Sequence, residues 1–259
     1  MRIILMKPSH GLKVALIFLL WGGRLAHGQT NWDQVFYERA QKACDDAGRL
    51  YRANPDNATN AWGYGSTCYD LAAQATNETQ RAAVARWGID ACRHLLALNP
   101  QSAPGHYYLA MNLGELAEAE APSLAAYKLV HEVEREFTEA AALDAKLDYA
   151  GPARCLGLLY RDAPGWPLSI GSKKKAQDWL NRAGRLAPGY PENALNLVET
   201  HLRWREREEA AAAWQKLEQL WPVAQTNLTG VTWEQPWHDW TKRREAARNE
   251  YQKLYKKTP

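Results

Sequence analysis

Apolar and polar positions follow one another along this chain with the period of an α-helix. The clearest case is the C-terminal stretch, where apolar residues recur at spacings of four, three, seven, four and three: Trp233, Trp237, Trp240, Ala247, Tyr251 and Leu254. The pattern predicts helices over residues 32–53, 58–75, 79–98, 104–118, 123–143, 151–162, 172–186, 190–204, 206–220 and 231–255. Pro and Gly separate several of these segments and stop the preceding helix.

β-branched aliphatic residues are rare in this sequence. From Gln29 onward there are two Ile and seven Val, while Ala, Leu, Glu, Arg and Lys are abundant. Strands draw heavily on Ile and Val, so a substantial sheet is excluded. The sequence therefore predicts an all-α protein.

A similar helix ending recurs along the chain. It ends at Pro55, Pro100, Ala145, Pro188 and Pro222, with spacings of 45, 45, 43 and 34 residues. The last spacing is the length of a tetratricopeptide repeat, a unit of two antiparallel helices. The longer spacings correspond to the same unit with about ten added residues. We therefore expect a right-handed solenoid of tetratricopeptide-like helical hairpins over residues 29–230.

The interior of the repeats supports this assignment. Small residues such as Gly157 and Ala183 stand where the two helices of a hairpin must approach closely. Bulky residues such as Leu156, Tyr160 and Leu180 stand where successive hairpins pack together. Residues 231–259 combine an apolar stripe with a basic face, which predicts a C-terminal capping helix that closes the end of the stack.

Residues 1–28 have the three parts of a secretory signal peptide. A basic start is followed by the eight apolar residues 14–21 and by a small-residue site, which predicts cleavage near Gly28 and Gln29. The alternative is an N-terminal membrane anchor, but eight residues fall short of the roughly 20 that span a bilayer. We expect a periplasmic or secreted protein without stable membrane insertion.

Charge and motifs exclude several function classes. Without the four basic residues of the leader, the chain has 28 Lys and Arg and 29 Asp and Glu, a net charge of −1. It therefore lacks the overall positive charge that would attract a nucleic acid. The chain has no HExxH, GxSxG or GxGxxG motif and no Cys/His cluster with metal spacing. We therefore expect a non-enzymatic protein with no catalytic residue, metal or cofactor.

The four cysteines matter because export would place them in an oxidising compartment. Antiparallel pairing of the helices over 32–53 and 58–75 sets Cys44 opposite Cys68, so a disulfide between them is predicted. Cys92 and Cys155 are expected to remain thiols in the core.

The repeat register also predicts a groove along the first helices of the hairpins. Arg154 and Arg161 are seven residues apart and therefore lie on the same side of their helix. We expect Glu115 and Glu199 to be their partners if they are buried, and Trp166, in a Pro- and Gly-rich loop, to form the lip of the groove. The candidate binding residues are Tyr108, Glu115, Arg154, Arg161, Trp166, Glu199 and Arg203.

Two interpretations of this groove remain open. Mixed charges over an aromatic and aliphatic floor suit a peptide or a helix of a partner protein. The same set suits a small carboxylate held by Arg154 and Arg161. Internal pairing of the arginines would favour the first interpretation, and an accessible, unpaired guanidinium would favour the second.

Two segments, residues 106–117 and 150–188, resemble a known family. The matching positions are Gly151, Pro152, Arg154, Leu156, Gly157, Pro164, Gly171 and Ala176. The segments are similar to periplasmic tetratricopeptide proteins of the TatT type, which are associated with TRAP solute transporters. The resemblance covers roughly residues 104–222. It implies a helical repeat protein with a ligand-accessible groove, whose partner is a transporter component or whose ligand is a small organic-acid or apolar solute.

Overall fold

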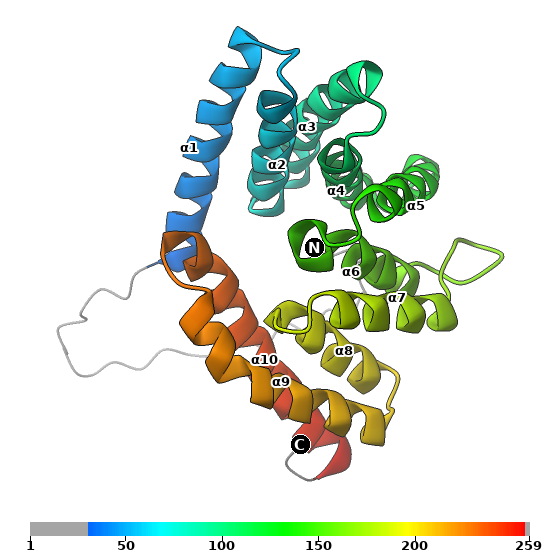
Figure 1. Ribbon diagram of the computed structural model, residues 1–259. Helices are drawn as coiled ribbons and strands as arrows, with labels where there is room; N and C mark the ends of the chain where they lie inside the picture. The colour runs from blue at the N-terminus through cyan, green and yellow to red at the C-terminus, as the bar shows by residue number, and fades with distance from the viewer. Residues whose placement is uncertain (1–30, 257–259) are drawn as a thin grey trace, which may run out of the picture.

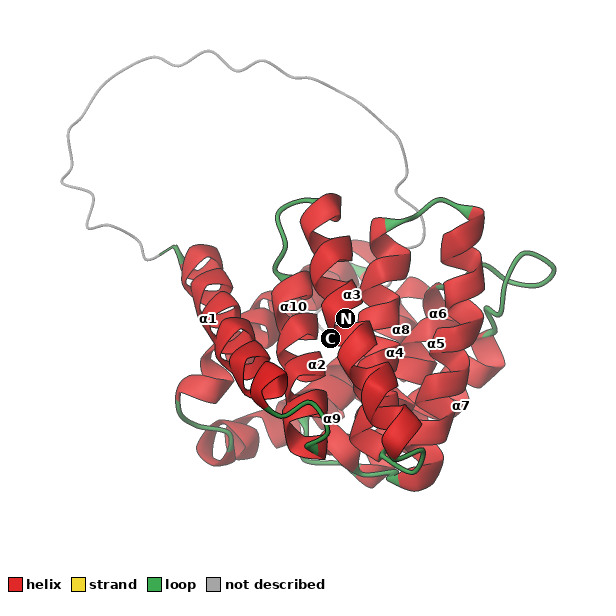
Figure 2. Ribbon diagram, turned by 90° about the horizontal axis from the view of Figure 1, so that it is seen from above, coloured by secondary structure: helices red, strands yellow, loops and turns green. Residues whose placement is uncertain are grey.

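A computed structural model describes residues 31–256, and the predicted leader, residues 1–28, lies outside them. These described residues form α-helices and one short 3₁₀ turn joined by loops, without a strand (Figure 2). The helices are α1 (Trp32–Ala53), α2 (Ala58–Ala73), α3 (Glu78–Leu98), α4 (Ala103–Ala119), α5 (Leu124–Leu143), α6 (Leu147–Asp162), α7 (Lys173–Leu186), α8 (Pro191–Arg203), α9 (Arg207–Asn227) and α10 (Glu234–Tyr255), with η1 (Val231–Trp233) before α10. The all-α prediction is confirmed.

Adjacent helices pack as the hairpins α2–α3, α4–α5, α6–α7 and α8–α9. The first helix of each hairpin also lies beside the first helix of the next, α2 against α4 most closely. This is the packing of a tetratricopeptide-like solenoid. The stack curves so far that α9 and α10 return to the beginning of α1 (Figure 1).

Local sequence signals set most helix starts. The residue before the helix caps it by accepting a hydrogen bond from a backbone N–H of the first turn, which satisfies a donor that the helix leaves free. The capping residues are Asn31, Asn57, Asn77, Ser102, Ser123 and Ser172. The expected boundaries therefore agree with the observed ones to within a residue or two for most helices.

Helix α9 extends well past its predicted end. Helix α9 continues through Pro222 to Asn227, whereas the expected end was residue 220. A proline inside a helix removes one backbone hydrogen bond. Here Trp221 and Ala224 are buried on both sides of the proline. Packing of the added turns outweighs the local cost.

The predicted close approach within a hairpin is visible at Gly157. A Cβ atom at this position would lie 2.6 Å from Cγ of Leu180 on α7, so a side chain has no room there. Position 157 therefore needs a glycine for α6 and α7 to pack.

Helix α10 packs against the last hairpin, as expected of a cap. Trp240 and Tyr251 are buried in a cluster with residues of α8 and α9. The ring of Trp237 lies 5.1 Å from that of Trp221, and the Arg244 guanidinium lies over the Trp221 ring. Within the described part of the chain, no helix is long and apolar enough to cross a membrane.

The first helix meets this cap. The rings of Phe36 and His238 lie 5.6 Å apart, and Trp32 stacks on Phe36 from the same helix. Arg39 forms an ion pair with Glu234 at 2.6 Å. The start of α1 is thus in direct contact with the start of α10, which closes the curve of the solenoid.

Candidate binding surfaces

Arg154 is buried in α6, where internal partners hold its guanidinium. Its Nη2 donates to Asp148 at 2.8 Å, its Nη1 donates to Asn193 at 3.3 Å, and its Nε lies 3.7 Å from Glu192. The ring of Tyr190 covers it, with the centroid 5.1 Å from the guanidinium carbon. The donors of Arg154 are therefore used inside the protein.

The pKa of Glu192 shows how strongly the charges of this network interact. Burial alone would raise the pKa of its carboxyl. The positive charges of Arg154 and Arg243 outweigh burial and lower the pKa to about 2. Glu192 is therefore ionised at neutral pH and balances the buried arginine.

Arg161 and Arg203 share one carboxylate. Arg161 donates to both oxygens of Asp162 at 2.8 Å and to the hydroxyl of Thr200 at 3.2 Å. Arg203 donates to the same Asp162 at 2.8 Å. These contacts join α6 to α8 and give both arginines a structural role.

The expected glutamate partners have other cations. Glu199 accepts two hydrogen bonds from Arg243 of α10, at 2.9 and 2.8 Å. Glu115 lies 3.8 Å from Arg81 of α3, and burial followed by the charge of Glu118 raises its pKa to about 7. The expected pairing of Glu115 and Glu199 with Arg154 and Arg161 was therefore wrong. Repeat position could not identify partners that α3 and α10 contribute.

Trp166 lies in the loop between α6 and α7, which projects from the stack (Figure 1). Its side chain is 89% exposed and that of Leu168 is 74% exposed. Backbone hydrogen bonds hold the base of the loop, from Gly171 N to the Pro164 carbonyl and from Ser172 N to the Tyr160 carbonyl, both at 2.9 Å. In the structure Trp166 faces solvent rather than the arginine network.

A second surface runs over α2, α4 and the turn that begins α6. We call it the aromatic–acidic face and define it by Trp62, Tyr69, Asp70, Tyr108, Asp148 and Tyr149. The rings of Trp62 and Tyr108 stack across the two helices at 6.0 Å. Each of the six side chains is at least partly open to solvent. Tyr108 is the one member that the repeat register had identified.

Electrostatics connect the members of this face. Asp70 is exposed but crowded by neighbouring helices, and this crowding, followed by the charge of Asp148, raises its pKa to about 7. No cation among the described residues offsets the rise. Asp148 lies in a left-handed turn with Tyr149, at φ 48° and 54°. Asp148 accepts a hydrogen bond from the Tyr107 hydroxyl of α4 at 2.7 Å, and the Tyr149 ring stacks on that of Tyr190 at 4.5 Å. Asp148 is paired with Arg154, so Asp70 is the carboxylate of this face that lacks an internal counterion among the described residues.

A sequence signal for this face existed in α2. Trp62 and Tyr69 are seven residues apart, which is two helical turns, so they lie on one side of the helix. The contribution of Asp148 depends on a backbone turn that residue pattern does not reveal.

The two cysteines predicted to pair are neighbours. The sulfur atoms of Cys44 and Cys68 lie 3.6 Å apart, both buried and both as thiols. A disulfide needs about 2.05 Å between the sulfurs. The disulfide therefore stays a prediction for oxidising conditions. Cys155 lies 3.7 Å from the sulfur of Met111 instead.

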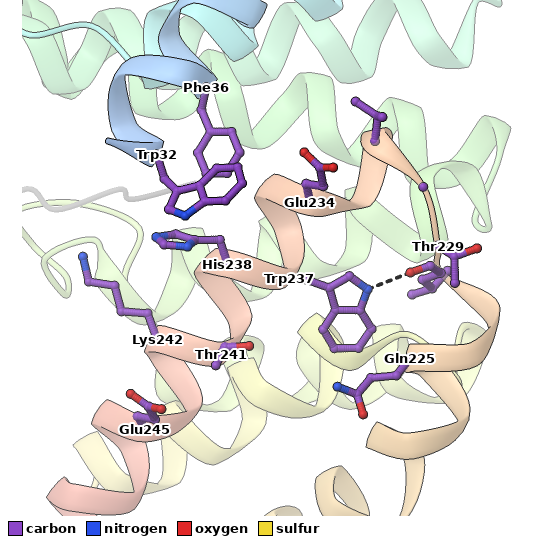
Figure 3. Close-up of a pocket in the computed structure, with 13 residues that line it drawn as sticks. Trp32, Phe36, Gln225, Thr229, Glu234, Trp237, His238, Thr241, Lys242 and Glu245 are labelled. Carbon is purple, nitrogen blue, oxygen red and sulfur yellow. Dashed lines mark hydrogen bonds between the residues drawn. The ribbon is translucent and has the colours of Figure 1, made fainter. Parts of the chain in front are cut away.

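A cavity of about 900 Å³ lies where α1 meets α10 (Figure 3). Side chains from the start of α1, the end of α9 and the start of α10 line it. Its walls come from residues about two hundred positions apart, so periodicity and repeat register do not predict it. Among the described residues, no group of three or more His, Cys, Asp or Glu side chains could hold a metal ion.

Comparison with known proteins supports the fold alone. No family model matches the chain, and no curated protein matches it. Among solved structures, the crystal structure of MamA, a helical protein of the tetratricopeptide-like type, superposes with a TM-score of 0.51 and 16% sequence identity. The match covers 77% of this chain and 99% of the MamA chain. It agrees with a tetratricopeptide-like helical solenoid.

Proposed function

We propose that this protein is an exported, non-enzymatic scaffold that binds a protein or peptide partner on its aromatic–acidic face. Tetratricopeptide-like solenoids present the first helices of their hairpins to partners, and this face lies on such helices. The internal pairing of Arg154 and Arg161 supports a partner held by shape, apolar contact and acidic side chains.

Asp70 is the observation that carries the proposal. It is an exposed carboxylate on α2, and no cation of the described residues acts on it. A lysine or arginine of a partner would supply the missing counterion. Trp62 and Tyr108 offer stacked rings beside it, which suit apolar side chains and cations alike. The partner segment is therefore basic with interspersed apolar residues.

The alternative function is that of a TatT-like accessory of a TRAP-type transporter, with a small organic-acid or apolar solute in the groove. The resemblance over residues 104–222 supports it. An acid held by Arg154 and Arg161 would have to displace Asp148 and Asp162 from them. Breaking buried ion pairs of this kind costs several kcal/mol, so the geometry favours the partner-binding function.

A peptide-binding experiment tests the proposal. We expect a fluorescently labelled peptide of about ten residues made of Lys, Leu and Tyr to bind, and its Glu-for-Lys counterpart not to bind. Asp70→Arg should weaken binding at least tenfold in fluorescence anisotropy. Asp90→Arg is the matched control, because Asp90 is an exposed aspartate on α3, the second helix of its hairpin. Equal binding by the two variants would contradict the proposal.

The export part of the proposal has its own test. Expression with the leader in a Gram-negative host should yield a protein in the periplasmic fraction whose first residue, by mass spectrometry, is Gln29. An intact N-terminus on membrane-bound protein would instead identify residues 1–28 as an anchor.

A further inference from the structure

The cavity between α1 and α10 has the size of a small-molecule site. Its volume of about 900 Å³ lies within the 300–1,000 Å³ that is usual for pockets holding small organic ligands. It forms where the two ends of the solenoid meet, with α1 on one side and the α9–α10 corner on the other (Figure 3). It lies apart from the aromatic–acidic face, with no lining residue in common.

Aromatic rings form opposite walls of the cavity. Trp32 and Phe36 stack at 5.5 Å on the α1 side, where Trp32 is still 39% exposed. Trp237 forms the other wall, and its indole N–H donates to the Leu228 carbonyl at 2.7 Å, which holds the ring in place. Leu228 and Val231 add aliphatic surface. Preformed walls of this kind suit a flat apolar body.

The charged side chains around the cavity differ in whether another residue of the protein already pairs with them. Glu234 is neutralised by Arg39 at 2.6 Å. Lys242 is exposed and has no ion-pair partner among residues 31–256, and its side chain extends toward Trp32 and His238 (Figure 3). Glu245 lies almost one turn farther along α10, away from these rings (Figure 3). The charge beside the aromatic wall is therefore a cation.

We propose that this cavity binds a small organic molecule with a flat apolar body and one negatively charged group, which pairs with Lys242. The aromatic walls supply most of the affinity by burying the apolar body. Lys242 selects the acid over a neutral molecule of the same shape. This inference does not depend on the partner-binding function and would stand if that function failed.

Two probes that share one aromatic body, with and without an anionic group, test this proposal on the full-length protein. 1-Anilinonaphthalene-8-sulfonate carries an aromatic body and an anion, and N-phenyl-1-naphthylamine is the same body without the sulfonate. We expect saturable binding of one sulfonate probe per chain in isothermal titration calorimetry. Lys242→Gln should weaken the sulfonate probe on the order of fivefold and leave the neutral probe unchanged. Lys253→Gln, an exposed lysine on the same helix outside the cavity, should change neither.

A second variant tests the place of binding. Thr241 is an exposed cavity residue, so Thr241→Trp fills the space without disturbing the core. It should abolish binding of both probes while the circular dichroism and the melting temperature stay at wild-type values. Gln225→Trp, on the α9 side of the cavity, should do the same and stands in if Thr241→Trp does not fold.

Three results would overturn the proposal. The first is a wild-type titration without saturable heat. The second is unchanged binding in folded Thr241→Trp and Gln225→Trp, which would place the probe elsewhere on the surface. The third is equal loss in Lys242→Gln and Lys253→Gln, which would reduce the role of Lys242 to general surface charge.

Discussion

Two regions on the first helices of the hairpins carry the same kinds of side chain, charged and aromatic. They differ in whether the charges are paired within the protein. Around α6, α8 and α10, the charges of Arg154, Glu192 and Arg243 pair with one another and aromatic rings cover them. On the aromatic–acidic face, Asp70 is exposed and has no cation beside it. The first region is closed and structural, while the second is open and available to a partner.

The helices that pack beside the two regions explain the difference. Helix α10 packs onto α8 and brings Arg243 and Trp240 with it. Helix α1 packs on α2 through Cys44 and Tyr51, and contributes no cation to Asp70. Residues on the first helices of the hairpins therefore stay open or brace the fold according to the charges that neighbouring helices bring to them.

Deleting residues 231–259 should have the largest effect, because it removes α10 from the last hairpin. The deletion exposes the buried Trp214 and Trp221 of α9 and leaves Glu192 without Arg243. We expect aggregation or loss of a cooperative thermal transition, measured by size-exclusion chromatography with light scattering and by calorimetry. A truncated chain that stays monomeric with an unchanged melting temperature would show that α10 is not a cover.

Arg154→Met tests the closed region alone. It leaves Asp148 without its buried cation and Glu192 with Arg243 alone, so we expect a loss of about 3–5 kcal/mol in the free energy of unfolding. Chemical denaturation without any ligand measures it. Arg203→Met is the control, because the Arg203 side chain is 56% exposed and its loss should cost less than about 1 kcal/mol. Unchanged stability of Arg154→Met together with lost ligand binding would instead make Arg154 a recognition residue.

Oxidation of Cys44 and Cys68 should strengthen the α1 end, which lacks the ion-pair network of the α10 end. The bond would close a loop of 24 residues and stabilise the protein by about 3 kcal/mol. Non-reducing peptide mapping of exported protein should recover the two cysteines in one linked fragment, with Cys155 as a free thiol. Recovery of both as thiols, or paired elsewhere, would refute the prediction.

Glu115 should give a smaller, pH-dependent effect. Its folded pKa of about 7 exceeds the ordinary value of 4.5, so the folded state favours the protonated carboxyl. The stability that this group contributes is present below pH 4.5 and is lost as the pH rises to 7. Glu115→Gln should therefore raise the free energy of unfolding at pH 8 by on the order of 1 kcal/mol and change it little at pH 4.

Thermal melts at the two pH values measure this difference. Glu208→Gln, at an exposed glutamate of α9, should have no effect at either pH. A destabilising effect of Glu115→Gln at pH 8 would mean that the ion pair with Arg81 dominates over burial.

The amino-acid pattern alone was enough to predict the helices and their pairing in adjacent hairpins. Period, capping residues and the 34-residue spacing act between neighbours along the chain or between adjacent hairpins, so their signals are local. Gly157 is an example, because the residue that it must avoid lies in the next helix. The α9 boundary differed because burial of Trp221 and Ala224 carries the helix past Pro222.

The folded structure was needed to show which charged side chains pair internally and where a cavity forms. Arg243 reaches Glu199 from another helix, 44 positions away, and Trp32 meets His238 across the whole chain. These contacts depend on how far the solenoid curves, which is the sum of many small packing angles between hairpins. No local pattern encodes that sum. The ion-pair partners and the cavity between α1 and α10 are therefore visible only in the folded structure, where the starts of these two helices meet.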